Sequence, residues 1–268
     1  MFQSVKTVIT ENWQNRYRLI RLANYELKAQ NYGTMFGFLW NFFNPALQIF
    51  VYWFVFAIGL RQASPQDDYP YLIWMIAGII PWFYISGAMQ SSATSIYAYS
   101  NILKRMRFPL AIVPVKTVLS QFIGHIWALL VIFVVMICAG VRFSLRNLQL
   151  IYFMFSGLCF LIALSLLFSS ITVLFKDFQK FLSSAIRLLF YITPIVWSQL
   201  SLNPTLVFVL KLNPFYYLVE GYRESLLYPH GLLYHWRQML YFWSITLILF
   251  VIGSNMHMKF RKQFIDLL

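Results

Sequence analysis

His125 is the ionisable side chain whose position most invites a chemical role. It lies in the middle of a long apolar stretch, about nine residues and hence roughly 13 Å beyond Lys116. Such a histidine can contact a substrate or carry a proton, or it can be a neutral side chain that hydrogen-bonds across helices. We favour the neutral side chain, and His125 stays a candidate contact for a transported molecule.

The carboxylates lie outside the middle of every apolar stretch, and this excludes several classes of protein. They are Glu11, Glu26, Asp67, Asp68, Asp177, Glu220, Glu224 and Asp266. Transporters driven by protons or sodium ions usually carry acidic groups at mid-membrane depth, so ion coupling is not expected. No Ser-His-Asp grouping, His-Glu-x-x-His pattern or carboxylate pair points to an enzyme, and no cluster has the spacing of a metal site.

The chain also lacks the residues that would let it bind ATP alone. A Walker A phosphate-binding loop requires the dipeptide Gly-Lys, which does not occur in the sequence. We therefore expect no cofactor on this chain, and ATP and Mg²⁺, if they drive it, must bind another polypeptide. Cys138 and Cys159 lie in apolar stretches and are interpreted as small core residues.

Composition identifies the environment that holds these residues. Of the 268 residues, 60% are hydrophobic and 11% are charged, whereas soluble proteins average about 45–50% and 25%. The 21 Lys and Arg against 8 Asp and Glu give a net charge of +13. On so apolar a chain, this charge indicates basic loops that face anionic lipids and a protein partner, and nucleic acid is not expected. The sequence predicts an all-α membrane protein.

Six apolar stretches have roughly the length of membrane spans, which is about 20 residues. They are Trp40–Leu60, Tyr71–Ser91, Pro114–Gly140, Leu148–Phe175, Phe181–Trp197 and Met239–Met256. With an even number of spans, fifteen Lys and Arg lie on the side of the termini and six on the other, which places both termini in the cytoplasm. A seventh span over Leu206–Val219 is the alternative, but that segment is short and contains Lys211 and Asn213-Pro214.

Residues 1–39 are expected to form a cytoplasmic region with a helix in the membrane interface, and residues 40–268 to form the membrane domain. One helix face is apolar except for Asn24, and carries Trp13, Tyr17, Ile20, Asn24 and Leu27. Another face carries Arg18, Arg21, Tyr25 and Lys28. A soluble amphipathic helix packed on a partner is the alternative. Lys116, at the cytoplasmic start of the third span, is expected to extend to the lipid headgroups.

Two connections between spans have compositions of their own. The cytoplasmic linker Tyr97–Pro109 interleaves basic and apolar residues and ends at a proline, which predicts a short helix. The external segment Ser198–Gln238 contains three prolines and enough Leu, Phe and Tyr to stay at the membrane. Because backbone at membrane depth must be hydrogen-bonded, we predict short re-entrant helices over about residues 198–238.

Aromatic residues make up 20% of the chain, and several of them lie in the first two predicted spans. Sugars stack on aromatic rings, so these side chains are candidates to line a path for a glycan, although aromatic belts and lipid contacts are their commoner role in membranes. The candidates are Tyr52, Trp53, Phe54 and Phe56 in the first span and Trp74, Trp82, Phe83 and Tyr84 in the second.

A series of short motifs follows in order along nearly the whole chain: Gly37-x-x-Trp40-x-x-x-x-Pro45, Arg107-Phe108-Pro109, Lys176-Asp177, Thr193-Pro194-Ile195, Asn213-Pro214 and Tyr222-Arg223. Together with the six spans, this order resembles the ABC-2 permeases that export polysaccharides and polyol phosphates. The segments Tyr25-Glu26-Leu27-Lys28, Asn44-Pro45-Ala46-Leu47-Gln48 and His257-Met258-Lys259-Phe260-Arg261 are most similar to wall teichoic acid export permeases of Gram-positive bacteria.

This resemblance implies a half-transporter in a bacterial plasma membrane, which forms a homodimer and binds two copies of a separate cytoplasmic ATPase. The cytoplasmic linkers would then be coupling helices seated on that ATPase, although a solvated loop that obeys the charge rule is the alternative. The implied coupling residues are Asn101, Ile102, Leu103, Lys104, Arg105, Met106, Arg107 and Phe108 in the first linker and Lys176, Asp177 and Lys180 in the second.

The resemblance also implies a cargo and a route. Wall teichoic acid linked to undecaprenyl diphosphate would be flipped to the outer side, its lipid tail in the bilayer and its polar part between the two permease copies. Arg18, Arg21 and Lys28 are the candidate diphosphate contacts, with anionic lipids as an equal alternative. An external gate is assigned to Asn213, Pro214, Glu220, Tyr222, Arg223 and Glu224, in which Glu220 and Arg223 can face each other on one helix.

Two other functions stay open. An O-antigen or capsular polysaccharide permease has the same architecture with a different cargo. A membrane-embedded transferase that acts on a polyprenyl-phosphate sugar is a member of another class, and the absence of paired carboxylates at the membrane surface disfavours it.

Overall fold

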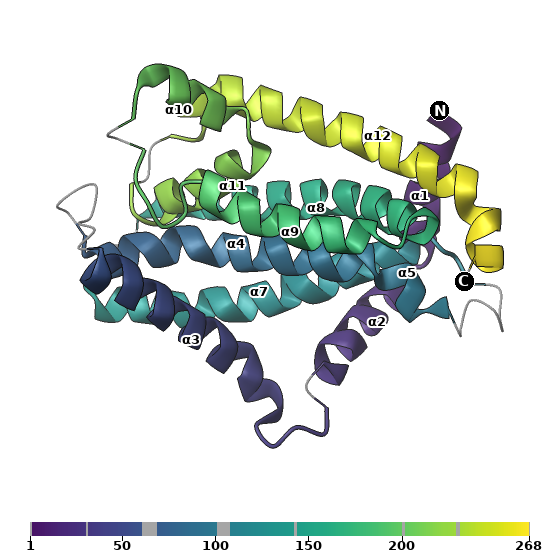
Figure 1. Ribbon diagram of the computed structural model, residues 1–268, viewed down its shortest axis with the longest axis horizontal. Coiled ribbons are helices and arrows are strands. Elements are labelled where there is room, and N and C mark those ends of the chain that lie inside the picture. Colours follow the sequence, from purple (N-terminus) through teal and green to yellow (C-terminus); the bar gives the residue numbers. More distant parts are fainter. Residues whose placement is uncertain are drawn as a thin grey trace.

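The computed structural model describes residues 2–30, 32–60, 69–100, 108–141, 144–199, 202–228 and 231–267. Within these ranges the chain is built from helices, and no strand occurs among them (Figure 1). The elements are α1 (Phe2–Gln14), α2 (Arg16–Ala29), η1 (Gly37–Leu39), α3 (Trp40–Trp53), η2 (Phe54–Gly59), α4 (Tyr71–Ala93), α5 (Ser95–Ala98), α7 (Ile112–Cys138), η3 (Leu145–Leu148), α8 (Gln149–Leu174), α9 (Phe178–Ile192), α10 (Pro204–Lys211), α11 (Pro214–Leu226), η4 (Leu232–His235) and α12 (Trp236–Leu267).

Five helical segments in the described chain are long and apolar enough to cross a membrane: α3 with its continuation η2, α4, α7, α8 and α12. They correspond to five of the six predicted spans. The remaining predicted span, Phe181–Trp197, falls on α9, which has 15 residues and so covers about 22 Å, less than the roughly 30 Å of a hydrocarbon core. In Figure 1, α9 runs beside α8 and carries the chain toward α10 and α11. The count of six spans therefore stays a prediction.

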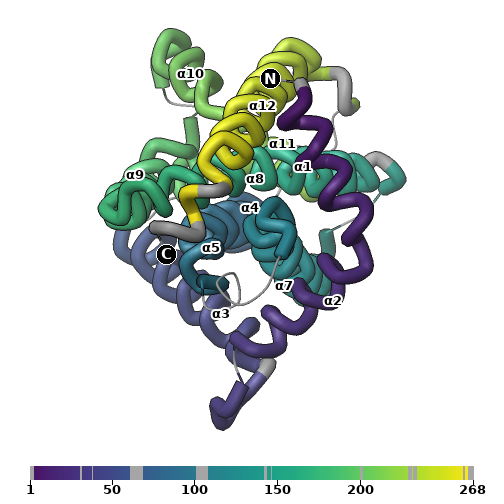
Figure 2. The backbone as a smooth tube through the Cα atoms, turned by 90° about the vertical axis from the view of Figure 1, so that its right-hand side faces the viewer, coloured from purple at the N-terminus to yellow at the C-terminus, as the bar shows by residue number. Residues whose placement is uncertain are grey.

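Helix α4 forms the centre of the bundle. Figure 2 shows it with α7, α8, α9 and α3 around it, and α11 also contacts it. In its most apolar 18-residue window 78% of the residues are buried inside the chain, whereas for α3 the share is 0%. A helix that is apolar on all sides is suited to a position inside a bundle, and α4 occupies that position.

Helix α3 stands apart from the rest of the bundle. It meets α4 near its C-terminal end and diverges from α4 toward its N-terminal end, where a loop returns to α2 (Figure 1). Pro45 lies inside the helix, and the last residues Phe54–Gly59 continue as a π-helix. Because no residue of α3 is buried within this chain, its apolar side chains are left for lipid or for another molecule.

The N-terminal helices are packed on the bundle, and they bring the two ends of the chain together. Helix α1 contacts α12, and α2 contacts α7; Arg261 of α12 forms an ion pair with Glu11 of α1. The face of α2 that packs inward carries Leu19, Ala23 and Leu27. Trp13, Tyr17 and Ile20 of the predicted interfacial face are exposed, whereas Leu27 of the same face is buried. A position of these helices in the membrane interface stays a prediction.

The segment between α9 and α12 contains two short helices, α10 and α11, each of which begins with an Asn-Pro pair. The side-chain oxygens of Asn203 and Asn213 accept hydrogen bonds from the backbone of Thr205 and Phe215 (both 3.0 Å), and the prolines occupy the first helical turn. Helix α10 has no buried residue, whereas most of α11 is buried. Short helices were predicted here, and whether they re-enter a membrane stays a prediction.

Candidate functional site

Arg223 of α11 is a buried arginine at the centre of the predicted external gate. Its side chain is 2% exposed, and Nη1 forms an ion pair with Glu220 Oε2 at 2.7 Å. The guanidinium also donates to the carbonyl oxygens of Pro194 (3.2 Å) and Ile195 (2.9 Å), and it lies 3.8 Å from the ring centroid of Trp74. A buried cation requires such partners. Arg223 thus joins α11 to α4 and to the chain that follows α9.

A glycine on α4 makes room for this arginine. A Cβ at Gly78 would lie 2.2 Å from Arg223 Nη2 and 3.2 Å from the carbonyl oxygen of Ile195. A side chain at this position would therefore displace the guanidinium from its acceptors. The sequence alone gave no reason to single out Gly78, and it offered Trp74 only as a candidate for a glycan path, because neither residue lies near Arg223 along the chain.

The other predicted gate residues tie α11 to its surroundings. Asn213 Nδ2 donates to Thr193 Oγ1 at 2.9 Å, so the cap of α11 also holds the end of α9. Glu224 Oε1 lies 2.9 Å from Nε2 of His235 in η4. These contacts connect the helix to both neighbouring segments. A role in opening a path remains a prediction for all six residues.

His125 of α7 is hydrogen-bonded across helices. Its Nε2 lies 2.9 Å from the hydroxyl of Tyr222 on α11, and its ring stacks on Tyr84 of α4 with centroids 4.8 Å apart. His125 is 5% exposed. Its geometry matches the interpretation that we favoured from the sequence, a side chain that joins helices.

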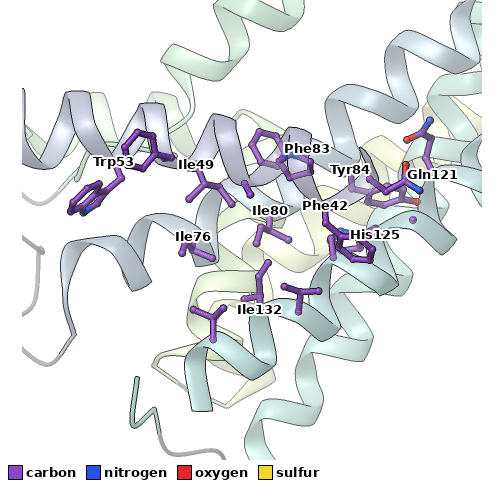
Figure 3. A pocket seen from close by; sticks show the side chains of 18 of the residues that line it. Phe42, Ile49, Trp53, Ile76, Ile80, Phe83, Tyr84, Gln121, His125 and Ile132 are labelled. Carbon is purple, nitrogen blue, oxygen red and sulfur yellow. The ribbon is translucent and has the colours of Figure 1, made fainter. Parts of the chain in front are cut away.

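A partly open cavity of about 570 Å³ lies between α3 and the pair α4 and α7. Figure 3 shows side chains from these helices pointing into it, with Trp53 and Ile76 toward one end and Gln121 toward the other. We call it the α3 groove. Its lining is Leu27, Gln30, Asn41, Phe42, Pro45, Ala46, Ile49, Phe50, Trp53, Leu72, Ile76, Ile80, Phe83, Tyr84, Gln121, Gly124, His125, Ala128, Val131, Ile132 and Val135.

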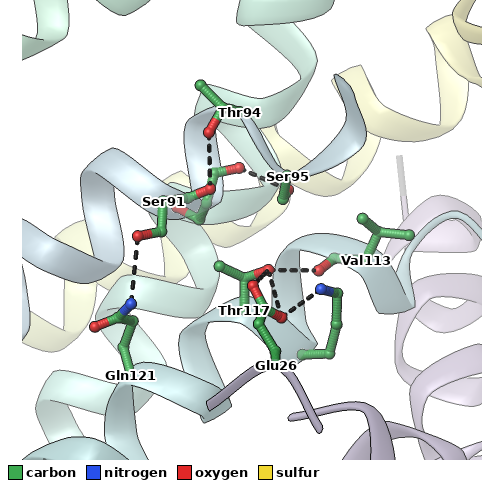
Figure 4. A network of polar contacts seen from close by, with 9 residues as sticks. Glu26, Ser91, Thr94, Ser95, Val113, Thr117 and Gln121 are labelled. Atoms are coloured by element: carbon green, nitrogen blue, oxygen red, sulfur yellow. Dashed lines mark hydrogen bonds and ion pairs between the residues drawn. The ribbon is translucent and has the colours of Figure 1, made fainter. Parts of the chain in front are cut away.

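Lys116 does not extend to lipid headgroups, which corrects the prediction from the sequence. The residue is 1% exposed, its ammonium group pairs with the carboxylate of Glu26 on α2, and Nζ lies 3.9 Å from the ring centroid of Tyr99. Thr117 Oγ1 donates to the same carboxylate at 3.2 Å (Figure 4). Because α2 packs on α7, it closes off the route to the headgroups and supplies a carboxylate instead.

Comparisons with known proteins identify the family. The family model of ABC-2 type transporters matches residues 17–227. The chain is a member of this family. It is 28% identical to an O-antigen export system permease protein RfbA of Klebsiella pneumoniae over 252 residues, which are 93% of this chain and 94% of that protein.

Further relatives have the same length and related names. The chain is 29% identical to the RfbA protein of Myxococcus xanthus, over 84% of this chain and 85% of that protein. It is 22% identical to the polysialic acid transport protein KpsM of Escherichia coli, over 82% of this chain and 84% of that protein. No relative named here is a teichoic acid permease.

The aromatic candidates for a path do not gather in one place in this ABC-2 permease. Trp53 and Tyr84 line the α3 groove together with His125. Trp82 is buried and lies on another side of α4, where its ring is 6.0 Å from both Phe190 and Phe215. Tyr52 meets Phe190 at 5.1 Å, and Phe56 packs against the main core. A role for these side chains in a glycan path stays a prediction.

The basic residues assigned to the diphosphate are all accessible in this ABC-2 permease. Arg18, Arg21 and Lys28 are exposed on α2, and Arg18 Nη1 lies 3.5 Å from Asn15 Oδ1 on the same helix. Of the two linkers, residues 101–107 lie outside the described residues. Phe108 packs near Tyr99. Asp177 and Lys180 are exposed and 3.7 Å apart, and Lys176 is exposed too. Binding of an ATPase by these residues remains a prediction.

Proposed function

We propose that this chain is the membrane subunit of an ATP-driven exporter of a lipid-linked polysaccharide of the O-antigen or capsular type. The observation that carries the proposal is similarity over 93% of the chain to an O-antigen export permease, within the ABC-2 family. Wall teichoic acid was the cargo that the sequence suggested, and the names of the relatives favour a polysaccharide instead.

A separate ATPase supplies the energy in this proposal. The sequence contains no Gly-Lys dipeptide and hence no Walker A loop. The exposed cations of the segment after α8, Lys176 and Lys180, offer a docking surface for a partner with acidic side chains. Two permease copies and two ATPase copies would form the complex, and ATP and Mg²⁺ would bind the ATPase.

Transport in this proposal depends on α11 and its neighbours. The polar part of the cargo cannot cross hydrocarbon unaided. It therefore passes beside protein, between the two copies. Arg223 and Glu220 hold α11 against α4 and the end of α9, so a movement of these helices would open or close the outer end of the route. Both termini would lie in the cytoplasm.

Reconstitution tests the proposal. The chain is co-expressed with an ABC ATPase from the same organism, purified as a complex and placed in vesicles with a lipid-linked polysaccharide. We expect ATP-dependent appearance of the glycan on the far side, and none with an ATPase unable to hydrolyse ATP. Export of lipid-linked teichoic acid in preference to polysaccharide would contradict the proposed cargo and favour wall teichoic acid, the cargo suggested by the sequence. Transfer of a sugar by the chain alone would replace transport with the transferase function.

A further inference from the structure

The α3 groove has the shape of a site for one extended hydrocarbon chain. Its lining residues run from Asn41 to Trp53 on α3 and from Leu72 to Tyr84 on α4, which at 1.5 Å per residue is about 18 Å along each helix. One leaflet of a bilayer contributes about 15 Å of hydrocarbon. The groove is therefore about as long as one leaflet is deep.

The polar side chains of the groove are placed toward one end. Gln30 follows the end of α2, Asn41 lies in the first turn of α3, and Gln121 donates to Ser91 Oγ of α4 at 3.3 Å (Figure 4). This is the end that the charge distribution places at the cytoplasm. The opposite end is formed by apolar residues such as Trp53, Leu72 and Val135. Such a gradient suits a ligand with a polar head and an apolar tail.

Positive charge lies on the helix that closes the polar end. Leu27 and Gln30 of α2 line the groove, and Lys28 and Arg21 are exposed on a neighbouring face of the same helix. Cationic side chains at a membrane surface favour an anionic headgroup, and phosphate oxygens accept several hydrogen bonds from them. The head of the ligand is thus expected to be a phosphate or diphosphate.

We infer that the α3 groove binds the polyprenyl chain of the lipid-linked cargo, with the diphosphate at the α2 end. The inference rests on the proposed function and adds a place for the lipid anchor. Because α3 buries no residue in this chain and meets α4 mainly near its C-terminal end, a chain can slide in from the bilayer between α3 and α7. The anchor would be held by the same copy that positions its diphosphate.

A photoreactive polyprenyl phosphate tests this site. The permease–ATPase complex in vesicles is irradiated with a diazirine-bearing polyprenyl phosphate, and the labelled residues are identified by mass spectrometry. We expect labels on α3 and α7 at groove positions, and competition by unlabelled polyprenyl phosphate but not by phosphatidylglycerol. Equal competition by phosphatidylglycerol would overturn the inference, because the groove would then hold membrane lipid.

Variants that fill the groove provide the second arm. Ala46→Trp and Ala128→Trp place a large ring in the open space of the groove, and exclusion of a few methylene groups should reduce labelling about tenfold or more. Leu47→Trp and Ile126→Trp are the matched controls, because both side chains are exposed and neither lines the groove. Undiminished labelling in the groove-filling variants would overturn the inference.

Two further outcomes separate this inference from the proposed function. Cross-linking between copies through a cysteine at Ala128 would assign the groove to the second copy and would overturn the inference. If the wild-type complex exports polysaccharide but the lipid label is found outside the α3 groove, the inference is overturned and the proposed function is retained. A chain that captures no ATPase and exports nothing would instead contradict the proposed function.

Discussion

Two buried cations each pair with a glutamate in this ABC-2 permease, and each pair fixes a different helix. Lys116 neutralises Glu26 and so fixes α2 on α7, whereas Arg223 pairs with Glu220 and fixes α11 on α4 and on the end of α9. Removing one partner of a buried pair is costly because the other charge is left without compensation. The stability of each helix contact can therefore be tested with single substitutions.

Glu26→Gln should destabilise the protein by about 3 kcal/mol. This value is the lower end of the free-energy cost of breaking a buried ion pair. We expect the lower end because Glu26 is 24% exposed, although Lys116 is only 2% exposed. Thermal unfolding in detergent provides the measurement. Lys28→Gln, on the exposed side of α2, is the control and should change little. If both variants unfolded at the same temperature, the pair would not be holding α2.

Gly78→Ala should destabilise the protein by about 1–3 kcal/mol, because the added methyl group collides with the guanidinium of Arg223. Alanine is otherwise the better residue in a helix, by about 1 kcal/mol. Gly157→Ala in α8 is the matched control, since its Cβ would meet nothing closer than 3.8 Å. We expect opposite signs for the two changes in unfolding temperature. A stabilised Gly78→Ala variant would show that the arginine contact is not fixed.

At the scale of elements, the contrast between α4 and α3 stands out. Helix α4 is enclosed on all sides by its own chain, whereas α3 leaves its apolar surface to other molecules. Small residues permit the closest helix contacts: a Cβ at Gly253 of α12 would lie 3.0 Å from the carbonyl oxygen of Ala163 in α8. The bundle of α4, α7, α8 and α12 is thus the rigid part against which α3 and α11 are placed.

In the proposed function, the turn between α8 and α9 offers its exposed cations to an ATPase. Lys176→Glu together with Lys180→Glu should reduce capture of the ATPase about tenfold or more, because the reversed charges repel an acidic partner. The unfolding temperature should stay the same, since both side chains are exposed. Capture is measured as the ratio of the two subunits after affinity purification. Lys211→Glu, in α10 at the other end, is the control, and equal capture in both variants would exclude this surface.

At the scale of the whole molecule, the contact between the two ends of the chain agrees with the prediction of an even number of spans. Helices α1 and α12 contact each other and share the Glu11–Arg261 pair. An even number of crossings is needed to bring two ends of a membrane chain to one side. With five helices of sufficient length, α9 and the residues that follow it would make the sixth crossing.

Accessibility of single cysteines tests this topology. In a background with Cys138 and Cys159 replaced by Ser, an impermeant maleimide on intact cells should label Thr205→Cys in α10. Gln3→Cys and Gln263→Cys should react only after the membrane is opened. All three positions are exposed in the structure. Labelling of Gln263→Cys on intact cells would contradict a cytoplasmic C-terminus, and labelling of Gln263→Cys without labelling of Gln3→Cys would contradict an even number of spans.

The sequence predicted the parts of this fold that depend on the local chain. Long apolar runs located five helices that are long enough to span a membrane. The helical spacing near the N-terminus predicted the exposure of Trp13, Tyr17 and Ile20 but not the burial of Leu27. The three-residue spacing of Glu220 and Arg223 foretold their ion pair. Each of these depends on neighbours within a few helical turns.

Contacts between residues far apart along the chain could not be predicted from the sequence. Glu26 and Lys116 are 90 residues apart. The sequence therefore gave no sign of their ion pair, and Lys116 was predicted to be a cation at the lipid headgroups. The burial of Arg223, and the requirement that residue 78 has no side chain, follow only from how α11 packs on α4. The α3 groove arises from the tilt of α3, which apolar periodicity cannot give. Tertiary packing decides all three.

The Glu11–Arg261 pair also has a consequence for how the protein is made. The two residues are 250 positions apart, so the first helix leaves the ribosome long before its partner exists. Until then Trp13 of α1, together with Tyr17 and Ile20 of α2, can keep these two helices on the surface of the bilayer. The last helix thus completes the fold at both ends of the chain, and a nascent protein that stops short of Arg261 would leave its first helix without this anchor.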